Sequence, residues 1–221
     1  MSSTPVSPAL ADSSLLQDRD YTIILARTAT AYPTPPPDAA HRWAAAQTAV
    51  INLVQQCEAL DPDGITLYVS CRGEGDDCQF RQYEHVTSST LTAAIEENYP
   101  PEEIDLQVVL PNALADFLSR KATHDTKSNG EIILVILDGE PKGRFDIART
   151  IMQTSQQLDH DSELGIGFVQ IGQDPIAQGF LQLLDNDLKA AGAKFDIVDT
   201  KAIATITPSS LTDFLLGVLN D

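Results

Sequence analysis

Basic side chains are scarce in this sequence of 221 residues. Lys and Arg number 14 against 32 Asp and Glu, which gives a formal net charge of -18. Non-specific binding to nucleic acid depends on Lys and Arg side chains that replace the counterions of the phosphates. Anionic membrane surfaces attract basic proteins for a related electrostatic reason. We therefore expect neither a nucleic acid nor a membrane among the partners of this chain.

Cysteines and long apolar runs are also scarce. Cys57, Cys71 and Cys78 are too few for a disulfide scaffold and form no Cys-x-x-Cys pair. Cys71 and Cys78 flank a turn and could clip a hairpin, but in a reducing compartment we expect them to stay free. No stretch approaches the roughly 18 consecutive apolar residues of a membrane span, and the first residues lack the features of a signal peptide. The expected location is cytoplasmic.

The sequence has no motif of a familiar catalytic or nucleotide-binding centre. It contains neither a Gly-x-Ser-x-Gly elbow nor a Gly-x-x-x-x-Gly-Lys phosphate loop. Its histidines belong to different expected elements, so neither a zinc site nor a histidine base is indicated. We expect a protein that is not an enzyme and that uses no cofactor.

What the sequence does contain is a regular alternation of apolar runs and helical periodicity. Residues 1–18 are rich in Ser, Pro and Ala and predict a flexible leader, and residues 19–221 fit one domain. Strands are predicted at 21–26, 64–70, 132–137, 164–171 and 194–198, with a short edge strand after a turn that follows the second of these. Helices are predicted at 41–60, 90–98, 105–121, 145–158, 175–188 and 210–219, the last with a capping box from Ser210 to Asp213. This alternation predicts a doubly wound, mostly parallel α/β sheet with helices on both faces.

In such a sheet the ligand crevice lies beyond the carboxyl ends of the strands, where the strand order reverses. Three loops can reach that crevice: ARTAT after the first strand, PPEEIDL before the central helix, and LDGEPKG after the central strand. A binding site is expected where these loops meet.

The same three loops carry a resemblance to the von Willebrand factor type A domain, in particular to small stand-alone versions from bacteria, including cyanobacteria. The resemblance extends over nearly all of residues 19–221 and includes RDYTIIL, the pair Arg42 and Trp43, DPDGITLYV, EIILVILDGEP and GAKFDIVDT. It implies a Rossmann-like sheet of about six strands with one antiparallel edge strand.

The resemblance also implies a metal-ion-dependent adhesion site that has degenerated. In the family, a first-loop Asp-x-Ser-x-Ser, a second-loop threonine and a third-loop aspartate hold Mg²⁺, which prefers hard oxygen ligands. The matching positions here are Ala26, Thr28, Thr30, Ile104 and Asp138. Alanine and isoleucine offer no side-chain oxygen, so we expect no metal site. If an ion did bind, Thr28, Thr30 and Asp138 would be its ligands.

The resulting expectation is a non-catalytic interaction or adaptor module that binds a protein partner through these loops. The expected partner-binding residues are Arg27, Thr28, Thr30, Tyr32, Ile104, Asp105, Asp138 and Glu140. The proline-rich segment 33–37 favours an extended polyproline II conformation at the rim of the crevice, where it either contacts the partner or only stiffens the chain.

Three alternatives stay open from the sequence. Thr28 and Thr30 could simply bond the backbone of their own loop, and Asp138 could bond backbone amides of the first loop. A rebuilt acidic set of Asp138, Asp105 and Glu140 could make partner binding depend on a divalent cation. A more remote alternative is an enzyme similar to the α/β hydrolases.

Overall fold

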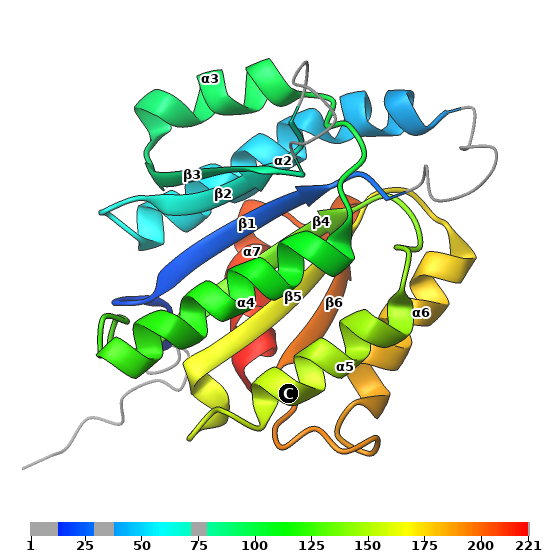
Figure 1. Ribbon diagram of the computed structural model, residues 1–221. Helices are drawn as coiled ribbons and strands as arrows, with labels where there is room; N and C mark the ends of the chain where they lie inside the picture. Colours follow the sequence, from blue (N-terminus) through cyan, green and yellow to red (C-terminus); the bar gives the residue numbers. More distant parts are fainter. Residues whose placement is uncertain (1–12, 29–37, 72–78, 221) are drawn as a thin grey trace, which may run out of the picture.

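A single six-stranded sheet forms the centre of the computed structural model, which describes residues 13–28, 38–71 and 79–220. Its strands are β1 (Asp20–Ala26), β2 (Ile65–Val69), β3 (Arg81–Val86), β4 (Glu131–Leu137), β5 (Leu164–Gln170) and β6 (Val198–Ala202). Their order is β3-β2-β1-β4-β5-β6, with β3 antiparallel to β2 and every other pair parallel (Figure 1). The predicted doubly wound, mostly parallel sheet with one antiparallel edge strand is confirmed.

Helices cover both faces of this sheet. One face packs against α2 (Ala39–Leu60), α3 (Ser88–Asn98) and α7 (Pro208–Asn220), and the other against α4 (Leu106–Thr123), α5 (Arg144–Ser155) and α6 (Pro175–Asp187). Three short 3-10 helices complete the described chain: η1 (Ser13–Leu16), η3 (Asp161–Glu163) and η4 (Ile203–Thr205). In this part of the chain, no helix is both long enough and apolar enough to cross a membrane.

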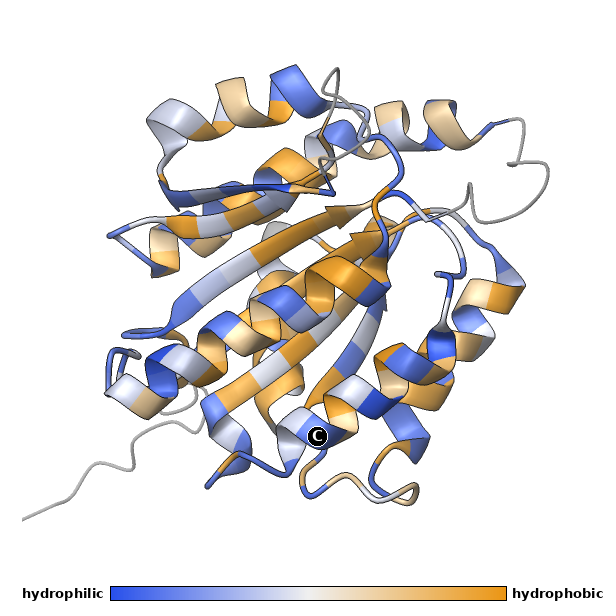
Figure 2. Cartoon of the chain, viewed as in Figure 1, coloured by the Kyte–Doolittle hydropathy of each residue, from blue (hydrophilic) through white to orange (hydrophobic). Residues whose placement is uncertain are grey.

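The central strand β4 divides the core into two layers. All seven of its residues are buried. Ile132, Leu134 and Ile136 join the core beneath α2 and α7, whereas Ile133, Val135 and Leu137 join the core beneath α4 and α5. Hydrophobic residues gather on the central strands and the helix sides that face them, while β3 is mostly hydrophilic (Figure 2). The unbroken apolar run of β4 is therefore the signature of a strand covered on both faces, as predicted.

The expected leader is partly folded. Leu16 of η1 is 1% exposed and belongs to the core, and its carbonyl accepts a hydrogen bond from the Tyr21 hydroxyl at 2.9 Å. The Arg19 guanidinium donates to the Leu15 carbonyl at 2.9 Å. Residues 13–18 thus belong to the domain rather than to a flexible leader, and residues 1–12 lie outside the described residues.

Two element predictions near the carboxyl terminus were wrong. The last strand begins at Val198 rather than spanning 194–198, and its burial falls off toward Ala202 because it is an edge strand. The capping box of α7 is formed by Thr207 and Ser210: the Ser210 amide donates to the Thr207 hydroxyl at 3.2 Å, and the Thr207 amide donates to the Ser210 hydroxyl at 2.9 Å. Because this helix begins at Pro208, Ser210 already lies in its first turn and cannot be the N-cap.

The cysteines also differ from expectation. Cys71 is disulfide-bonded rather than free, and its partner lies outside the described residues. Cys57 is free and buried in the core beneath α2.

Candidate functional site

The strand order reverses between β1 and β4. These two strands pair along seven residues, but the chain continues from β1 to β2 on one side and from β4 to β5 on the other. Thr28 follows β1, and Asp138 follows β4. The predicted crevice therefore lies where these residues leave the sheet.

The Asp138 carboxylate joins the first loop to helix α2. It is fully buried; one oxygen accepts the Thr28 backbone amide at 2.8 Å and the other accepts the Trp43 indole N–H at 2.6 Å. The Thr28 hydroxyl donates to the Gly139 carbonyl at 2.6 Å and accepts from the Gly139 amide at 3.2 Å. The first and third loops are thus bonded directly to each other. Asp138 accepts a backbone amide of the first loop, as predicted, whereas the Thr28 hydroxyl bonds the backbone of the third loop rather than that of its own.

The second loop attaches to the first through its backbone. The Ile104 amide donates to the Arg27 carbonyl at 3.3 Å, and Arg27 forms an isolated parallel bridge with Glu103. Ile104 is 3% exposed and packs in the same core as Ala26. Asp105 is the N-cap of α4, where it accepts the Gln107 amide at 2.9 Å.

Two ion pairs at the protein surface connect the third loop to the second loop and to the start of α5. Lys142 bonds Glu103 of the second loop at 2.6 Å, and the Glu103 carboxylate raises the pKa of the Lys142 amine. Glu140 pairs with Arg144 at 3.0 Å. The second and third loops are therefore joined at the surface by charge.

The structure brings six of the eight expected partner-binding residues together: Arg27, Thr28, Ile104, Asp105, Asp138 and Glu140. Thr28, Ile104 and Asp138 are buried, so their side chains support the loops and offer no surface to a partner. Thr30, Tyr32 and the proline-rich segment 33–37 lie outside the described residues.

The residues at the reversal point do not fit Mg²⁺. Ala26 and Ile104 place buried hydrocarbon at two of the ligand positions. The hollow beside Thr28 and Lys142 measures about 10 Å³, which is at the lower limit for even a single water molecule. Two further carboxylates of the second loop line this hollow, but Asp105 is engaged as a helix cap and Glu103 is paired with Lys142.

Exposed apolar side chains flank this loop surface, and the sequence did not single them out. Phe145, in the first turn of α5, is 77% exposed, and Ile176, in the first turn of α6, is 52% exposed. Both helices begin at the carboxyl edge of the sheet, directly after the loops that follow β4 and β5. The Arg144 guanidinium lies over the Phe145 ring, 5.1 Å from its centroid. Helical periodicity could not reveal these two residues, because an apolar residue in a first turn is also compatible with the core.

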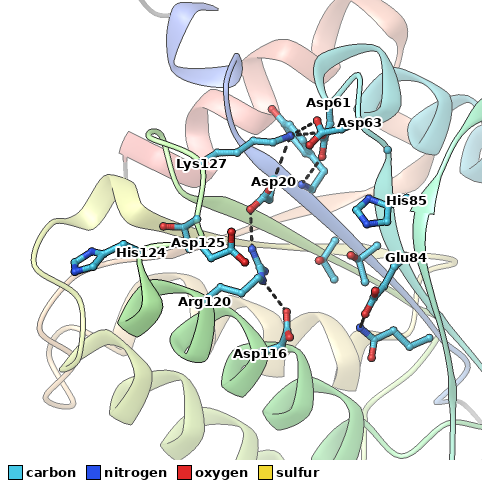
Figure 3. Close-up of a pocket in the computed structure, with 16 residues that line it drawn as sticks. Asp20, Asp61, Asp63, Glu84, His85, Asp116, Arg120, His124, Asp125 and Lys127 are labelled. Atoms are coloured by element: carbon cyan, nitrogen blue, oxygen red, sulfur yellow. Dashed lines mark hydrogen bonds and ion pairs between the residues drawn. The ribbon is translucent and has the colours of Figure 1, made fainter.

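A second hollow lies at the opposite, amino edge of the sheet. It encloses about 480 Å³ between α4 and β3, and β1 and β2 pass beneath it. Figure 3 shows Glu84 and His85 of β3 on one side and Asp116 and Arg120 of α4 on the other. We call it the amino-edge cleft.

Lys127 binds the carboxylates at the end of the amino-edge cleft that is formed by the turn after α2. Its amine bonds Asp61 directly, Asp63 at 2.6 Å and Asp20 at 3.5 Å. Asp61 also accepts the Tyr21 amide at 3.2 Å and is 1% exposed. Burial raises the pKa of Asp61 to about 6 although Lys127 opposes the shift, whereas Lys127 lowers the pKa of exposed Asp63 to about 2.

Arg120 binds the carboxylates on the α4 side of the amino-edge cleft. Its guanidinium contacts Asp20 at 2.7 Å, Asp116 at 2.9 Å and Glu131 at 2.5 Å. Glu131 is 1% exposed, and this burial raises the pKa of its carboxyl against the opposing effect of Arg120. Both cations of the cleft are thus held in place by carboxylates from several elements.

Sequence reasoning missed the amino-edge cleft. Its residues come from the starts of β1 and β2, the turn after α2, strand β3, the last turns of α4 and the turn that follows α4. The only signal was the density of acidic residues in these turns, and such residues usually indicate a solvated surface.

Neither a comparison with protein-family models nor a comparison with curated proteins gives a match for this chain.

Proposed function

We propose that this chain is a non-catalytic protein-binding module of the von Willebrand factor A type, in which internal hydrogen bonds have taken the place of a metal ion. Its partner binds at the carboxyl-edge loops that follow β1 and β4 and precede α4. No divalent cation takes part in this binding.

The observation that carries the proposal is the bonding of Asp138. Both of its oxygens accept hydrogen bonds from fixed donors, the Thr28 amide and the Trp43 indole. Mg²⁺ would have to displace at least one of these charge-assisted bonds and shed its own waters, with few oxygen ligands as replacement. The six-stranded sheet with an antiparallel edge strand agrees with the architecture that the family resemblance implies.

The accessible part of this edge combines apolar and charged groups. Phe145 is the most exposed large hydrophobic side chain in the described part of the chain, and the side chain of Lys142, which precedes it in the third loop, is 55% exposed. Aromatic side chains with a charged rim are typical of interface centres. A partner would therefore meet Phe145 as an apolar anchor, with the guanidinium of Arg144 over its ring and Glu140 paired to that guanidinium. Arg27 and Asp105 would contribute from the first and second loops.

Calorimetric titration with Mg²⁺, Mn²⁺ and Ca²⁺ tests the claim about the metal. We expect no saturable heat from the wild-type chain for any of the three ions. Saturable heat that disappears in Asp138→Ala would instead support the divalent-dependent alternative.

A pair of matched variants tests the proposed surface. Proteins crosslinked to the wild-type chain in its native extract are compared with those crosslinked to Phe145→Ala and to Leu183→Ala, both in the presence of EDTA. Leu183 is a suitable control because it is also a large exposed apolar residue, at 46%, but lies further along α6. The proposal predicts a partner that is lost with Phe145→Ala and kept with Leu183→Ala; equal retention by both variants would contradict it.

A further inference from the structure

We propose that the protein partner supplies a carboxylate group, which the guanidinium of Arg27 binds. This inference rests on the proposed function, because it concerns the same loop surface at the carboxyl edge of the sheet. It adds the chemical group that this surface recognises and the residue that recognises it.

The backbone of Arg27 is held in place by the second and third loops. Its carbonyl accepts the Ile104 amide at 3.3 Å, and Arg27 forms a parallel bridge with Glu103. The next residue, Thr28, donates its amide to Asp138 of the third loop at 2.8 Å. The side chain therefore extends from a fixed position, so binding a ligand costs little ordering of the backbone.

The side chain of Arg27 lacks the hydrogen bonds that a guanidinium normally forms. Its Nε is buried and forms no hydrogen bond, and no ion pair or side-chain hydrogen bond links Arg27 to any residue in the described ranges. Since Nε is the one nitrogen of this group that is both buried and unbonded, the two terminal nitrogens are open to a ligand. Buried charged donors normally have an acceptor, so its absence here indicates that another molecule supplies one.

Other cations at this edge are already paired with carboxylates of the chain. These are Lys142, Arg144 and Arg42. Arg27 differs from them because its donors are not used within the described part of the chain. A carboxylate matches these donors, because its two oxygens can accept two parallel N–H bonds from the planar guanidinium.

The surroundings of Arg27 favour one carboxylate over a phosphate. Glu103, Asp105 and Glu140 add negative charge to the same loops, and the whole chain carries -18. One guanidinium can balance a carboxylate in this field but not a phosphate dianion. The hollow beside Thr28 measures about 10 Å³, far below the roughly 300 Å³ of small-molecule sites. The carboxylate therefore belongs to a larger molecule on the surface, either as an acidic side chain or as a chain terminus.

A nuclear magnetic resonance titration tests the carboxylate site without the partner. The Nε–H resonance of Arg27, assigned by its loss in Arg27→Gln, is followed during addition of N-acetylglycine, N-acetylaspartic acid methylamide or acetamide at constant ionic strength. The first compound carries a chain-terminal carboxylate, the second a side-chain carboxylate, and acetamide has no charge. We expect a saturable shift with a carboxylate and none with acetamide, and the tighter of the two carboxylates identifies its source in the partner.

Arg120 provides the internal control for this titration, because its Nε is already bonded to Asp116 at the opposite edge of the sheet. Its resonance should stay in place. The absence of a saturable shift at Arg27, an equal shift at Arg120, or an equal response to acetamide would overturn the inference.

A second experiment repeats the crosslinking of the proposed function with variants of Arg27. We expect Arg27→Gln to reduce the crosslinked partner about tenfold and Arg27→Lys to restore part of it, because lysine keeps the charge but not the two parallel bonds. The control is Arg149→Gln, which removes an exposed arginine that pairs with Asp146 on α5. It should change the yield less than about twofold.

The two experiments separate this inference from the proposed function. If Phe145→Ala loses a partner that Arg27→Gln keeps, the carboxylate inference is wrong and the proposed function stands. If the carboxylate compounds bind at Arg27 but no crosslinked partner depends on Phe145, the proposed partner surface is wrong although Arg27 binds carboxylates.

Discussion

At the scale of single residues, Asp138 is the group on which the arrangement of the loops depends. Replacing it with alanine would leave the Trp43 indole and the Thr28 amide buried without their acceptor. Hydrogen bonds to charged groups contribute about 1.5 to 3 kcal/mol each, so we expect Asp138→Ala to lower the free energy of unfolding by roughly 3 kcal/mol. Urea denaturation measures this change.

A surface aspartate provides the comparison for Asp138. Asp146 is about half exposed, and among the described residues its one ion pair is with Arg149, across one helical turn. We expect Asp146→Ala to change the free energy of unfolding by less than about 0.5 kcal/mol. A similar loss in both variants would show that the Asp138 bonds contribute nothing specific.

Asp61 should make stability depend on pH in an unusual direction. Its pKa in the folded chain is raised to about 6 from an ordinary value of 3.8, so between these values the folded state binds the proton more tightly than the unfolded state. The resulting contribution to stability is fully present below about pH 4 and is lost as the pH rises through about 6. We expect the free energy of unfolding, relative to Asp61→Asn, to fall between these limits. A difference that rises with pH over the same window would contradict the raised pKa.

The contact between Thr28 and Asp138 could be predicted from the sequence, because each follows a strand at the expected reversal point. The Trp43 bond to Asp138 and the Lys127 bond to Asp61 could not. Each joins residues far apart in the chain and depends on how a helix end or turn lies against the sheet. Hydrophobic periodicity predicts which side of a helix is buried, but it does not predict which polar atoms form hydrogen bonds with each other.

At the scale of secondary-structure elements, two glycines should respond to alanine in opposite ways. Gly130, just before β4, has a φ of +79°, and a Cβ there would lie 2.0 Å from the Glu163 carbonyl oxygen. Gly179 lies in α6, where a Cβ would meet nothing within 4 Å. We expect Gly130→Ala to destabilise the protein by at least about 2 kcal/mol and Gly179→Ala to stabilise it by about 0.5 to 1 kcal/mol.

Thermal or urea unfolding of the two glycine variants provides the measurement. If Gly130→Ala were as stable as the wild type, the close approach of the turn before β4 to η3 would have to be wrong. A loss of stability in Gly179→Ala would show that α6 is packed on a side that the structure leaves exposed.

Element predictions succeeded where burial is two-sided and failed at the edges. The strands β1, β4 and β5 could be recognised from their apolar runs, because helices cover both faces of the sheet at these strands. β6 reads VDTKA, and only its first residue is fully buried, so the apolar segment just before it was mistaken for the strand. Two helix starts were also shifted, in opposite directions. The prediction for α4 included its N-cap Asp105, whereas the prediction for α7 began two residues late because it took Ser210 rather than Thr207 as the cap.

At the scale of the whole molecule, the net charge of -18 dominates the response to salt. Like charges repel each other across the folded surface, and added salt screens this repulsion. The ion pairs of Lys127 and Arg120 are largely shielded from solvent and should be weakened less. We expect moderate NaCl to stabilise the fold by about 1 kcal/mol, or roughly 3 °C in the unfolding midpoint. A midpoint that falls with salt would mean that surface ion pairs outweigh the general repulsion.

The hydrogen bond from Trp43 to Asp138 also provides an intrinsic fluorescence probe of the loops at the carboxyl edge of the sheet. Trp43 is the only tryptophan in the chain, and it is fully buried. Its indole N–H is tied to the carboxylate that joins the first and third loops, so the emission of this one fluorophore depends on whether those loops stay closed. Any separation of the first loop from the third can therefore be followed by intrinsic fluorescence without an added label.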